Sequence, residues 1–337
     1  MPLPSRDKLR RAAVATVAMS MCAGGLALSG DASSPAAASP VTTASAQDRS
    51  SSTAGAWVPL AAPSVLKALV PVDPFRSRAM RKFLSGRSGN ITAAVYDVGS
   101  NTTFDYHPDD REQTASIVKV DILATLLAQA QARHEPLSDE DEDVATGMIE
   151  ESDNDDATTL WDEEGGPGAV ASFDARLDMT QTTPNVAWGL TETTPRDQLR
   201  LLRHIALPNH VLHYDYRESE LYLMEHVISE DYWGISAGPA PGVTVAIKNG
   251  WLPVANGWQI NSIGMIHGDH RFYLIAVMTN GNADEDYGID TIEGISRIVW
   301  SYMRERFTSP STGPSGTTGP TGASSASGAS GATSSSG

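Results

Sequence analysis

Two residues three positions apart in an apolar stretch have the chemistry of an activated nucleophile. Ser116 and Lys119 lie at the start of a helix predicted over about 116–132, where residues three apart share one face. A serine hydroxyl is a weak nucleophile until a base takes its proton, and a desolvated lysine with a lowered pKa is such a base. The spacing therefore predicts Ser116 as a nucleophile and Lys119 as its proton partner.

The alternative is that Lys119 extends to the surface or pairs with Asp121. The apolar neighbours of this lysine make burial of an amine without a role costly. Lysine is also scarce, with five residues against nineteen arginines. After the N-terminal segment the chain contains only Lys67, Lys82, Lys119 and Lys248.

Ser152, Asp153 and Asn154 lie between an acidic helix predicted over about 139–149 and another over about 155–161. In a loop at the cleft, Ser152 would relay the proton of the leaving group and Asn154 would bind a substrate amide. The alternative is helix capping, because all three residue types are favoured N-caps.

Lys248, Asn249 and Gly250 end a predicted strand, and Trp251 follows. Gly250 would let backbone and substrate approach closely, and the amides of Trp251 and Ser116 would form an oxyanion hole. A strand end with a glycine turn is the alternative.

The elements that must position these residues follow from periodicity, capping and turn residues. Strands come first, then helices, then strands and a last helix, which predicts an α+β fold with a helical lobe, about 116–205, inserted between the halves of a mixed sheet. The Gly268-Asp269 pair is predicted to form a two-residue hairpin turn. The other predicted elements are strands 91–97 and 103–106 around a turn at 99–101, a helix 195–205 capped by Thr194, strands 243–248, 259–267 and 271–279, and a helix 289–307.

The N-terminus has the pattern of a secretory signal, with a basic start, an apolar run and small residues within 1–46. The sequence does not choose among cleavage after Ala32, Ala38 or Ala46. Cys22, the only cysteine, lies in the apolar run, so we expect a secreted protein without disulfides or thiol chemistry. Met21 disfavours a lipid anchor at Cys22, and we expect no membrane span after signal removal.

The formal net charge is −17, and removal of the basic signal makes the remainder more negative. Such a chain would repel nucleic acid and anionic membranes. We expect flexible segments at 47–64 and, in the Ser/Gly/Thr-rich tail, at 308–337, around one domain at 65–307. We expect a monomer that uses neither a metal nor a cofactor.

The three motifs in this order resemble those of class A β-lactamases and penicillin-binding proteins. The resemblance implies a five-stranded antiparallel sheet flanked by helices, an all-helical lobe, and a cleft between them. The patterns Trp188-Gly189-Leu190-Thr191 and Trp233-Gly234-Ile235-Ser236 resemble secreted actinobacterial serine hydrolases of the same superfamily.

The resemblance also implies a role for each motif residue. Ser116 would be acylated, Lys119 would activate it and Ser152 would carry a proton. Asn154 would hold the acylamide, and Lys248 would orient the substrate carboxylate. The implied substrates are β-lactams or D-Ala-D-Ala-like peptidoglycan stems.

Three departures from the family pattern modify this expectation. Asn249 replaces the usual Thr or Ser, and its amide would donate to the substrate in place of the hydroxyl. The interval from Ser116 to Ser152 is short, and the loop with a deacylating glutamate is absent between Arg176 and Pro195, where Glu192 is the only glutamate. We therefore expect acylation to be faster than hydrolysis.

Two alternatives remain open from the sequence. One is a D,D-peptidase or esterase that is inactive on β-lactams. The other is a non-catalytic module that uses the cleft to bind the cell wall.

Overall fold

The computed structural model describes residues 72–303. The predicted signal segment 1–46 with Cys22, the linker 47–64 and the tail 308–337 lie outside the described residues, as does the end of the last predicted helix at Phe307. The predicted domain 65–307 is described over most of its length.

A five-stranded antiparallel sheet forms the centre of the fold, as the family resemblance implies. The mixed sheet expected from the order of the elements is wrong, because all the strand pairs of this sheet are antiparallel. Its strand order is β2-β1-β7-β6-β5, so the first hairpin pairs with the last strand of the chain. In that order the strands are Thr102–Tyr106, Asn90–Asp97, Arg271–Asn282, Gly257–Gly268 and Thr244–Val254.

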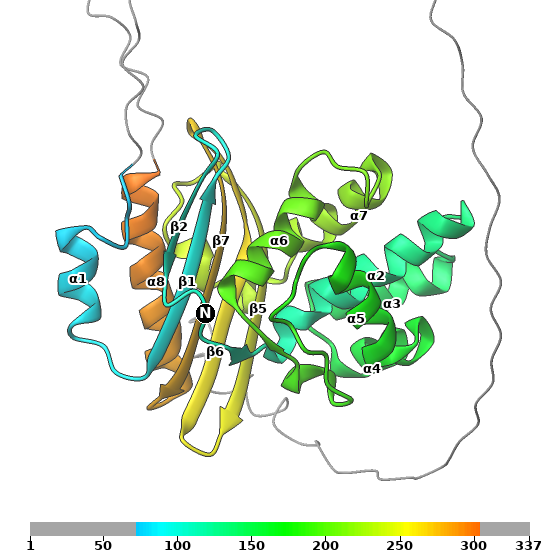
Figure 1. The fold of residues 1–337 in the computed structure, drawn as a ribbon, viewed down its shortest axis with the longest axis horizontal. Coiled ribbons are helices and arrows are strands. Elements are labelled where there is room, and N and C mark those ends of the chain that lie inside the picture. The colour runs from blue at the N-terminus through cyan, green and yellow to red at the C-terminus, as the bar shows by residue number, and fades with distance from the viewer. Residues whose placement is uncertain (1–71, 304–337) are drawn as a thin grey trace, which may run out of the picture. The chain divides into compact units, whose positions relative to one another are not determined.

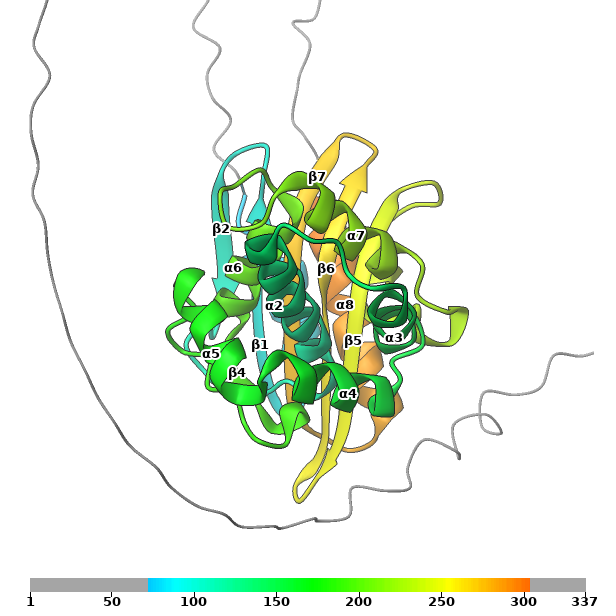
Figure 2. The same ribbon diagram turned by 90° about the vertical axis from the view of Figure 1, so that its right-hand side faces the viewer.

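Both faces of this sheet are buried. In β1, Ala94 and Tyr96 face one apolar cluster, whereas Ala93 and Val95 face another, as the twofold alternation of a strand requires. Helices α1 (Arg78–Leu84) and α8 (Glu285–Tyr302) cover the second face, and the helical lobe covers the first (Figures 1 and 2).

The helical lobe follows a 3₁₀ turn, η3 (Ala115–Ile117). Its first helix is α2 (Val118–Arg133). The helical stretch Ala115–Arg133, which joins η3 to α2, is long and apolar enough to cross a membrane, but 78% of its apolar window is buried inside the fold. Helix α2 is the core helix of the lobe, with the other helices around it. These are α3 (Asp139–Glu150), α4 (Asn154–Glu164), α5 (Gly166–Arg176), α6 (Pro195–Ala206) and α7 (Tyr214–Glu225).

Several predicted elements agree closely with the structure. The first hairpin is present, and the Thr194 side chain accepts a hydrogen bond from the Asp197 amide at the start of α6. Helices α3, α4 and α8 lie at the predicted positions, with ends that differ by a few residues.

Two local predictions are wrong. The hairpin turn between β6 and β7 is Asp269-His270, both at positive φ, because Gly268 already pairs with Arg271. The second error is at Gly250, where β5 does not end; it continues to Val254 and returns through Ala255-Asn256 into β6. The strand tolerates Pro253 because β5 is an edge strand, where a missing N–H leaves no partner unpaired.

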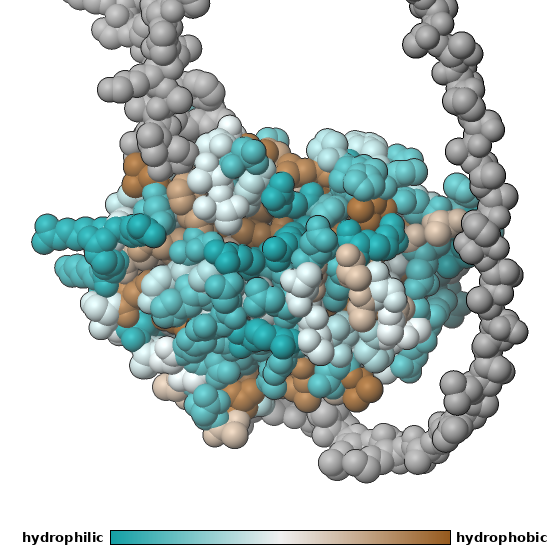
Figure 3. Space-filling view, viewed as in Figure 1, coloured by the Kyte–Doolittle hydropathy of each residue, from teal (hydrophilic) through white to brown (hydrophobic). Residues whose placement is uncertain are grey.

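Polar side chains cover most of the face shown in Figure 3, and the apolar areas between them are small and separate. This surface is typical of a globular domain whose large apolar groups are in the core.

Candidate active site

Ser116 lies in the middle of η3, half-buried, one turn before Lys119. Edge strand β5 packs directly against this turn at Gly250. A Cβ at Gly250 would lie 2.7 Å from the Ser116 nitrogen and 2.9 Å from the Ile117 nitrogen, so only glycine allows this approach. The predicted close contact at Gly250 is therefore a contact between two backbones, which fixes the serine turn against the sheet.

A second strand holds the segment before Ser116. The Asn261 amide of β6 donates to the carbonyl oxygens of Gln113 and Thr114, both at 2.8 Å. The Thr114 amide donates to Thr191 in the loop that follows α5. Residues from the sheet and from the helical lobe thus fix the turn that presents Ser116.

Backbone strain is concentrated at this site. Eight described non-glycine residues have positive φ, and six of them are Asn, Asp or His, which tolerate that region. The other two are Ala115, at φ 46°, and Ser152, at φ 56°. One immediately precedes Ser116 and the other contacts Lys119, and strained conformations of this kind are typical of functional sites.

Lys119 is fully buried and points to the second motif. Its Nζ donates to the Ser152 carbonyl oxygen at 2.6 Å, to Asn154 Oδ1 at 2.8 Å and to Ser152 Oγ at 3.2 Å. Burial, and then the positive charge of Lys248, hold the pKa of Lys119 well below that of an ordinary lysine. The amine is therefore suited to accept a proton near neutral pH.

Asp121, the alternative partner of Lys119, is oriented away from it. Asp121 is buried in the lobe next to Asp174 of α5, and burial and then the neighbouring charge of Asp174 raise the pKa of Asp121 well above its ordinary value. The hydrogen bonds of Lys119 go to Ser152 and Asn154 instead, so Lys119 does not pair with Asp121.

The second motif has both of the roles considered from the sequence. Asp153 caps α4 by accepting from the amides of Asp155 at 2.8 Å and Asp156 at 2.9 Å. Ser152 and Asn154, on either side of it, contact Lys119. Capping thus fixes the orientation of the two residues that contact the lysine.

Lys248 approaches Ser152 from the sheet. Its Nζ donates to Ser152 Oγ at 2.8 Å and to its neighbour's carbonyl oxygen, that of Asn249, at 3.3 Å. Burial lowers the pKa of Lys248 to about 8, and the negative charge of Asp231 opposes that shift. Ser152 Oγ thus lies between two amines and links the three motifs.

Asn249 does not face the cleft, and the prediction that its amide binds the substrate is wrong. The side chain is buried on the opposite face of β5, where its Nδ2 donates to the carbonyl oxygens of Asp231 at 2.7 Å and Trp233 at 3.0 Å. Side chains alternate along a strand, so Lys248 in the cleft requires Asn249 on the other side. Both N–H groups of this amide are used inside the fold.

Trp251 lies on the same face as Asn249, half-buried, with its ring edge-on to that of Trp233 at 5.9 Å. The indole is therefore part of the wall behind β5. The Trp251 backbone follows Gly250, next to the Ser116 amide, which is the neighbourhood predicted for an oxyanion hole.

Two residues near the lysines were not assigned to the site from the sequence. The Trp188 ring centroid lies 5.1 Å from Lys119 Nζ, and its Nε1 donates to Thr158 at 3.2 Å. Asp231 lies next to Lys248. Trp188 begins one of the two tryptophan-glycine patterns of the sequence, and Asp231 lies two residues before the other. This repeated pattern is the sequence signal that could have placed both residues at the site.

Glu192 lies at the surface of the domain. It is exposed in the short strand β4 (Glu192–Thr193), and its carboxylate lies 3.4 Å from Arg111. This geometry is that of a surface ion pair.

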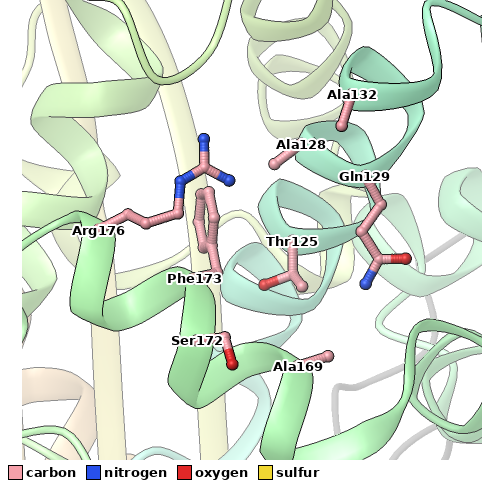
Figure 4. A pocket seen from close by; sticks show the side chains of 8 residues that line it. All are labelled: Thr125, Ala128, Gln129, Ala132, Ala169, Ser172, Phe173 and Arg176. Atoms are coloured by element: carbon pink, nitrogen blue, oxygen red, sulfur yellow. The ribbon is translucent and has the colours of Figure 1, made fainter. Parts of the chain in front are cut away.

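An open hollow of about 200 Å³ lies between α2 and α5. Figure 4 shows the side chains that line it. Phe173 and Arg176 line one side, and Thr125 and Gln129 line the other. None of the predicted site residues borders it. Within residues 72–303, no group of His, Cys, Asp and Glu is arranged to hold a metal ion.

Comparison with known proteins places this arrangement in context. The model of the β-lactamase enzyme family matches residues 140–303, which include the second and third motifs and begin after Ser116 and Lys119. No curated protein sequence matches the chain.

Solved structures extend the likeness over most of the described fold. An acyl-enzyme complex of a PBP-A mutant with penicillin G has a TM-score of 0.58 at 19% identity, covering 66% of this chain and 93% of that one. A β-lactamase from Xanthomonas campestris pv. campestris gives 0.59 at 17%, covering 66% and 96%. The TLA-3 extended-spectrum β-lactamase gives 0.60 at 18%, also covering 66% and 96%. At such identities these structures establish the fold.

Proposed function

Because the chain belongs to the superfamily of class A β-lactamases and penicillin-binding proteins, we propose that it is a serine hydrolase acylated on Ser116. The acyl donors are β-lactams or D-Ala-D-Ala-like peptides. The observation that carries the proposal is the chain of contacts from Lys119 through Ser152 to Lys248, next to a strained turn that presents Ser116.

In the acylation step, Ser116 Oγ attacks the carbonyl carbon and its proton passes to neutral Lys119. The backbone N–H of Ser116, with that of Trp251, stabilises the oxyanion. The amide C–N bond then breaks, and the leaving nitrogen receives a proton through Ser152, which lies between the two amines. The product is an ester on Ser116.

We further propose that this ester is hydrolysed slowly. An indole, that of Trp188, lies over Lys119, and Glu192 is held at the surface by Arg111. Hydrolysis needs a base that activates water, and general-base catalysis contributes about 10²- to 10⁴-fold. Without such a base near the ester, the acyl-enzyme accumulates.

A second candidate, a peptidase or esterase inactive on β-lactams, is favoured by the orientation of Asn249. The amide expected to receive a substrate carboxylate donates to Asp231 and Trp233 instead. Such an enzyme would use the same nucleophile on substrates that lack this carboxylate.

The biological setting is also a proposal. The basic and apolar N-terminal segment supports export of the chain, with action outside the cell as a monomer. Its acidic composition supports a small-molecule or peptide substrate and argues against nucleic acid as a partner.

Labelling with a fluorescent penicillin tests acylation. The wild-type chain and a Ser172→Ala control, which changes an exposed serine of α5, should both become covalently labelled. Ser116→Ala should not. A folded wild-type sample that takes up no label would contradict acylation by β-lactams, and a panel of ester and peptide donors would then test the second candidate.

A further inference from the structure

The groups that would receive a substrate carboxylate are already engaged within the protein. Both N–H groups of Asn249 are donated to carbonyl oxygens, and Lys248 Nζ donates to Ser152 and to the Asn249 carbonyl. A bound carboxylate would have to compete with these contacts.

A buried carboxylate, Asp231, is fixed beside Lys248. Asp231 ends the 3₁₀ turn η5 (Ser229–Asp231) and is 9% exposed. Its amide donates to the Ile228 carbonyl oxygen at 3.0 Å, and its carbonyl oxygen accepts from Asn249. The Ile228 amide in turn donates to Glu150 at the end of α3. The segment is thus anchored to both the sheet and the helical lobe, which holds Asp231 in one place.

The charge of Asp231 acts on both lysines of the site. It raises the pKa of Lys248 and of Lys119, against the effect of burial. Asp153 and Asp156 also raise the pKa of Lys119. With Lys119 neutral, Lys248 is the one ammonium group that these lysines contribute, and Asp231 already opposes its charge. A further anion therefore enters a site whose positive charge is largely balanced.

From this arrangement we infer that Asp231 is a specificity-determining residue that favours acyl donors without a carboxylate beside the scissile bond, such as neutral esters and amides. The inference rests on the proposed acylation of Ser116. It defines the substrate class: Asp231 takes the electrostatic place that a substrate carboxylate would otherwise fill. Carboxylate-bearing donors still react, but more slowly.

Thioester donors isolate this effect. Ser116 Oγ attacks the thioester carbonyl, the C–S bond breaks, and the hydroxyl proton passes through Lys119 and Ser152 to the solution or to the leaving thiolate. An acyl-thioglycolate leaves with a carboxylate, whereas its methyl ester leaves as a neutral thiol. The two donors share one scissile bond and differ in one charge.

The experiment measures kcat/KM for both donors from thiol release, with the full chain and its variants. Wild type should prefer the neutral donor. In Asp231→Asn the ratio of anionic to neutral kcat/KM should rise about tenfold, because the negative charge that opposes the anion is removed. Asp231→Glu keeps the negative charge and should therefore show the wild-type ratio.

Glu230→Gln is the matched control, because Glu230 is the exposed neighbour of Asp231 in the same turn. Its ratio should stay within about twofold of wild type, since exposed charges are screened by solvent. Wild type that prefers the anionic donor, or Asp231→Asn with an unchanged ratio, would overturn the inference and leave acylation intact. Failure of both donors to acylate folded wild type would overturn the proposed function itself.

Discussion

The fold buries two groups of ionisable side chains, and they differ in what surrounds them. At the cleft, Lys119 and Lys248 are fully buried, and each donates to oxygens of the second or third motif. Inside the helical lobe, the carboxyls of Asp121, Glu164, Asp174 and Glu220 are buried with few donors around them. Both groups pay for desolvation, but only the lysines are supplied with partners.

Burial shifts the pKa values of the two groups in opposite directions. Burial raises the pKa of Glu164 to about 10 and that of Asp174 to about 7, so these carboxyls resist ionisation in the folded state. The lysines have hydrogen-bond partners inside the fold, and their lowered pKa values suit proton transfer. Burial therefore makes the lysines of the cleft suited to proton transfer, whereas it keeps carboxyls of the lobe protonated.

The largest expected effect comes from removal of the amine at the cleft. Lys119→Met should lower kcat/KM for acylation about 10³-fold, because the general base is lost. Its melting temperature should stay the same or rise, since methionine fills the buried site without an amine to desolvate. Enzyme assays and thermal unfolding measure the two effects.

Lys82→Met serves as the control, because Lys82 is exposed in α1. It should change neither property. A Lys119→Met enzyme that still acylates within tenfold of wild type would show that the cleft lysine has no catalytic role, and the contrast with the carboxyls would disappear.

Glu164→Gln probes the other group. The pKa of Glu164 is raised in the folded state, so its contribution to stability is fully present below the unfolded pKa, near 4.5, and is lost as pH rises towards 10. Below about pH 7, Lys248 is charged in both states and adds no slope. At pH 7 the variant should therefore be more stable by up to about 3 kcal/mol, with a flatter pH dependence.

Denaturant unfolding between pH 5 and pH 7 measures this difference. Asp162→Asn, which changes an exposed carboxylate of the same helix, should leave the slope unchanged. A Glu164→Gln protein with the wild-type slope would mean that this carboxyl is ionised in the fold.

The pH profile of acylation sharpens the description of the lysines. The rate should rise with pH as Lys119 loses its proton, well below the ordinary lysine pKa. With a carboxylate-bearing donor it should fall again near pH 8, as Lys248 loses its charge. Because the two amines interact, the apparent pKa values of the rising and falling limbs describe the pair of lysines and not one lysine each. With that donor, a kcat/KM that keeps rising up to pH 10 and shows no descending limb would contradict the role given to Lys248.

The smallest effect is expected at an exposed carboxylate. Glu192→Gln removes a surface ion pair with Arg111 and should cost at most about 0.5 kcal/mol of stability. The rate of loss of the acyl-enzyme should stay within twofold of wild type. A tenfold slower loss would identify Glu192 as the deacylating base.

Local sequence signals predicted much of the fold. The first hairpin, the Thr194 cap and the apolar strands of the sheet each depend on residues close in the chain. Helix α5 was missed because it begins with Gly166-Pro167-Gly168, a sequence typical of a loop. Helix α7 was missed because its sequence is largely polar and has little periodicity, so tertiary packing decides its structure.

The candidate site was predictable only in part for the same reason. Ser116, Lys119, Ser152 and Lys248 have a recognisable spacing. The structure joins Lys119, Ser152 and Lys248 by hydrogen bonds and places the Ser116 backbone against Gly250 of the same strand as Lys248. The orientation of Asn249 depends on which face of β5 meets the cleft. The place of Asp231 depends on a segment anchored to two distant elements. Neither is encoded in neighbouring residues.

Intact-mass spectrometry over time tests the central claim most directly. After addition of benzylpenicillin, wild type should gain the mass of one whole penicillin, because ring opening loses no atoms, and should keep it long after free drug is removed. Ser116→Ala should gain nothing. Folded wild type without an adduct, or an equal adduct on Ser116→Ala, would contradict the assignment of Ser116 as the nucleophile.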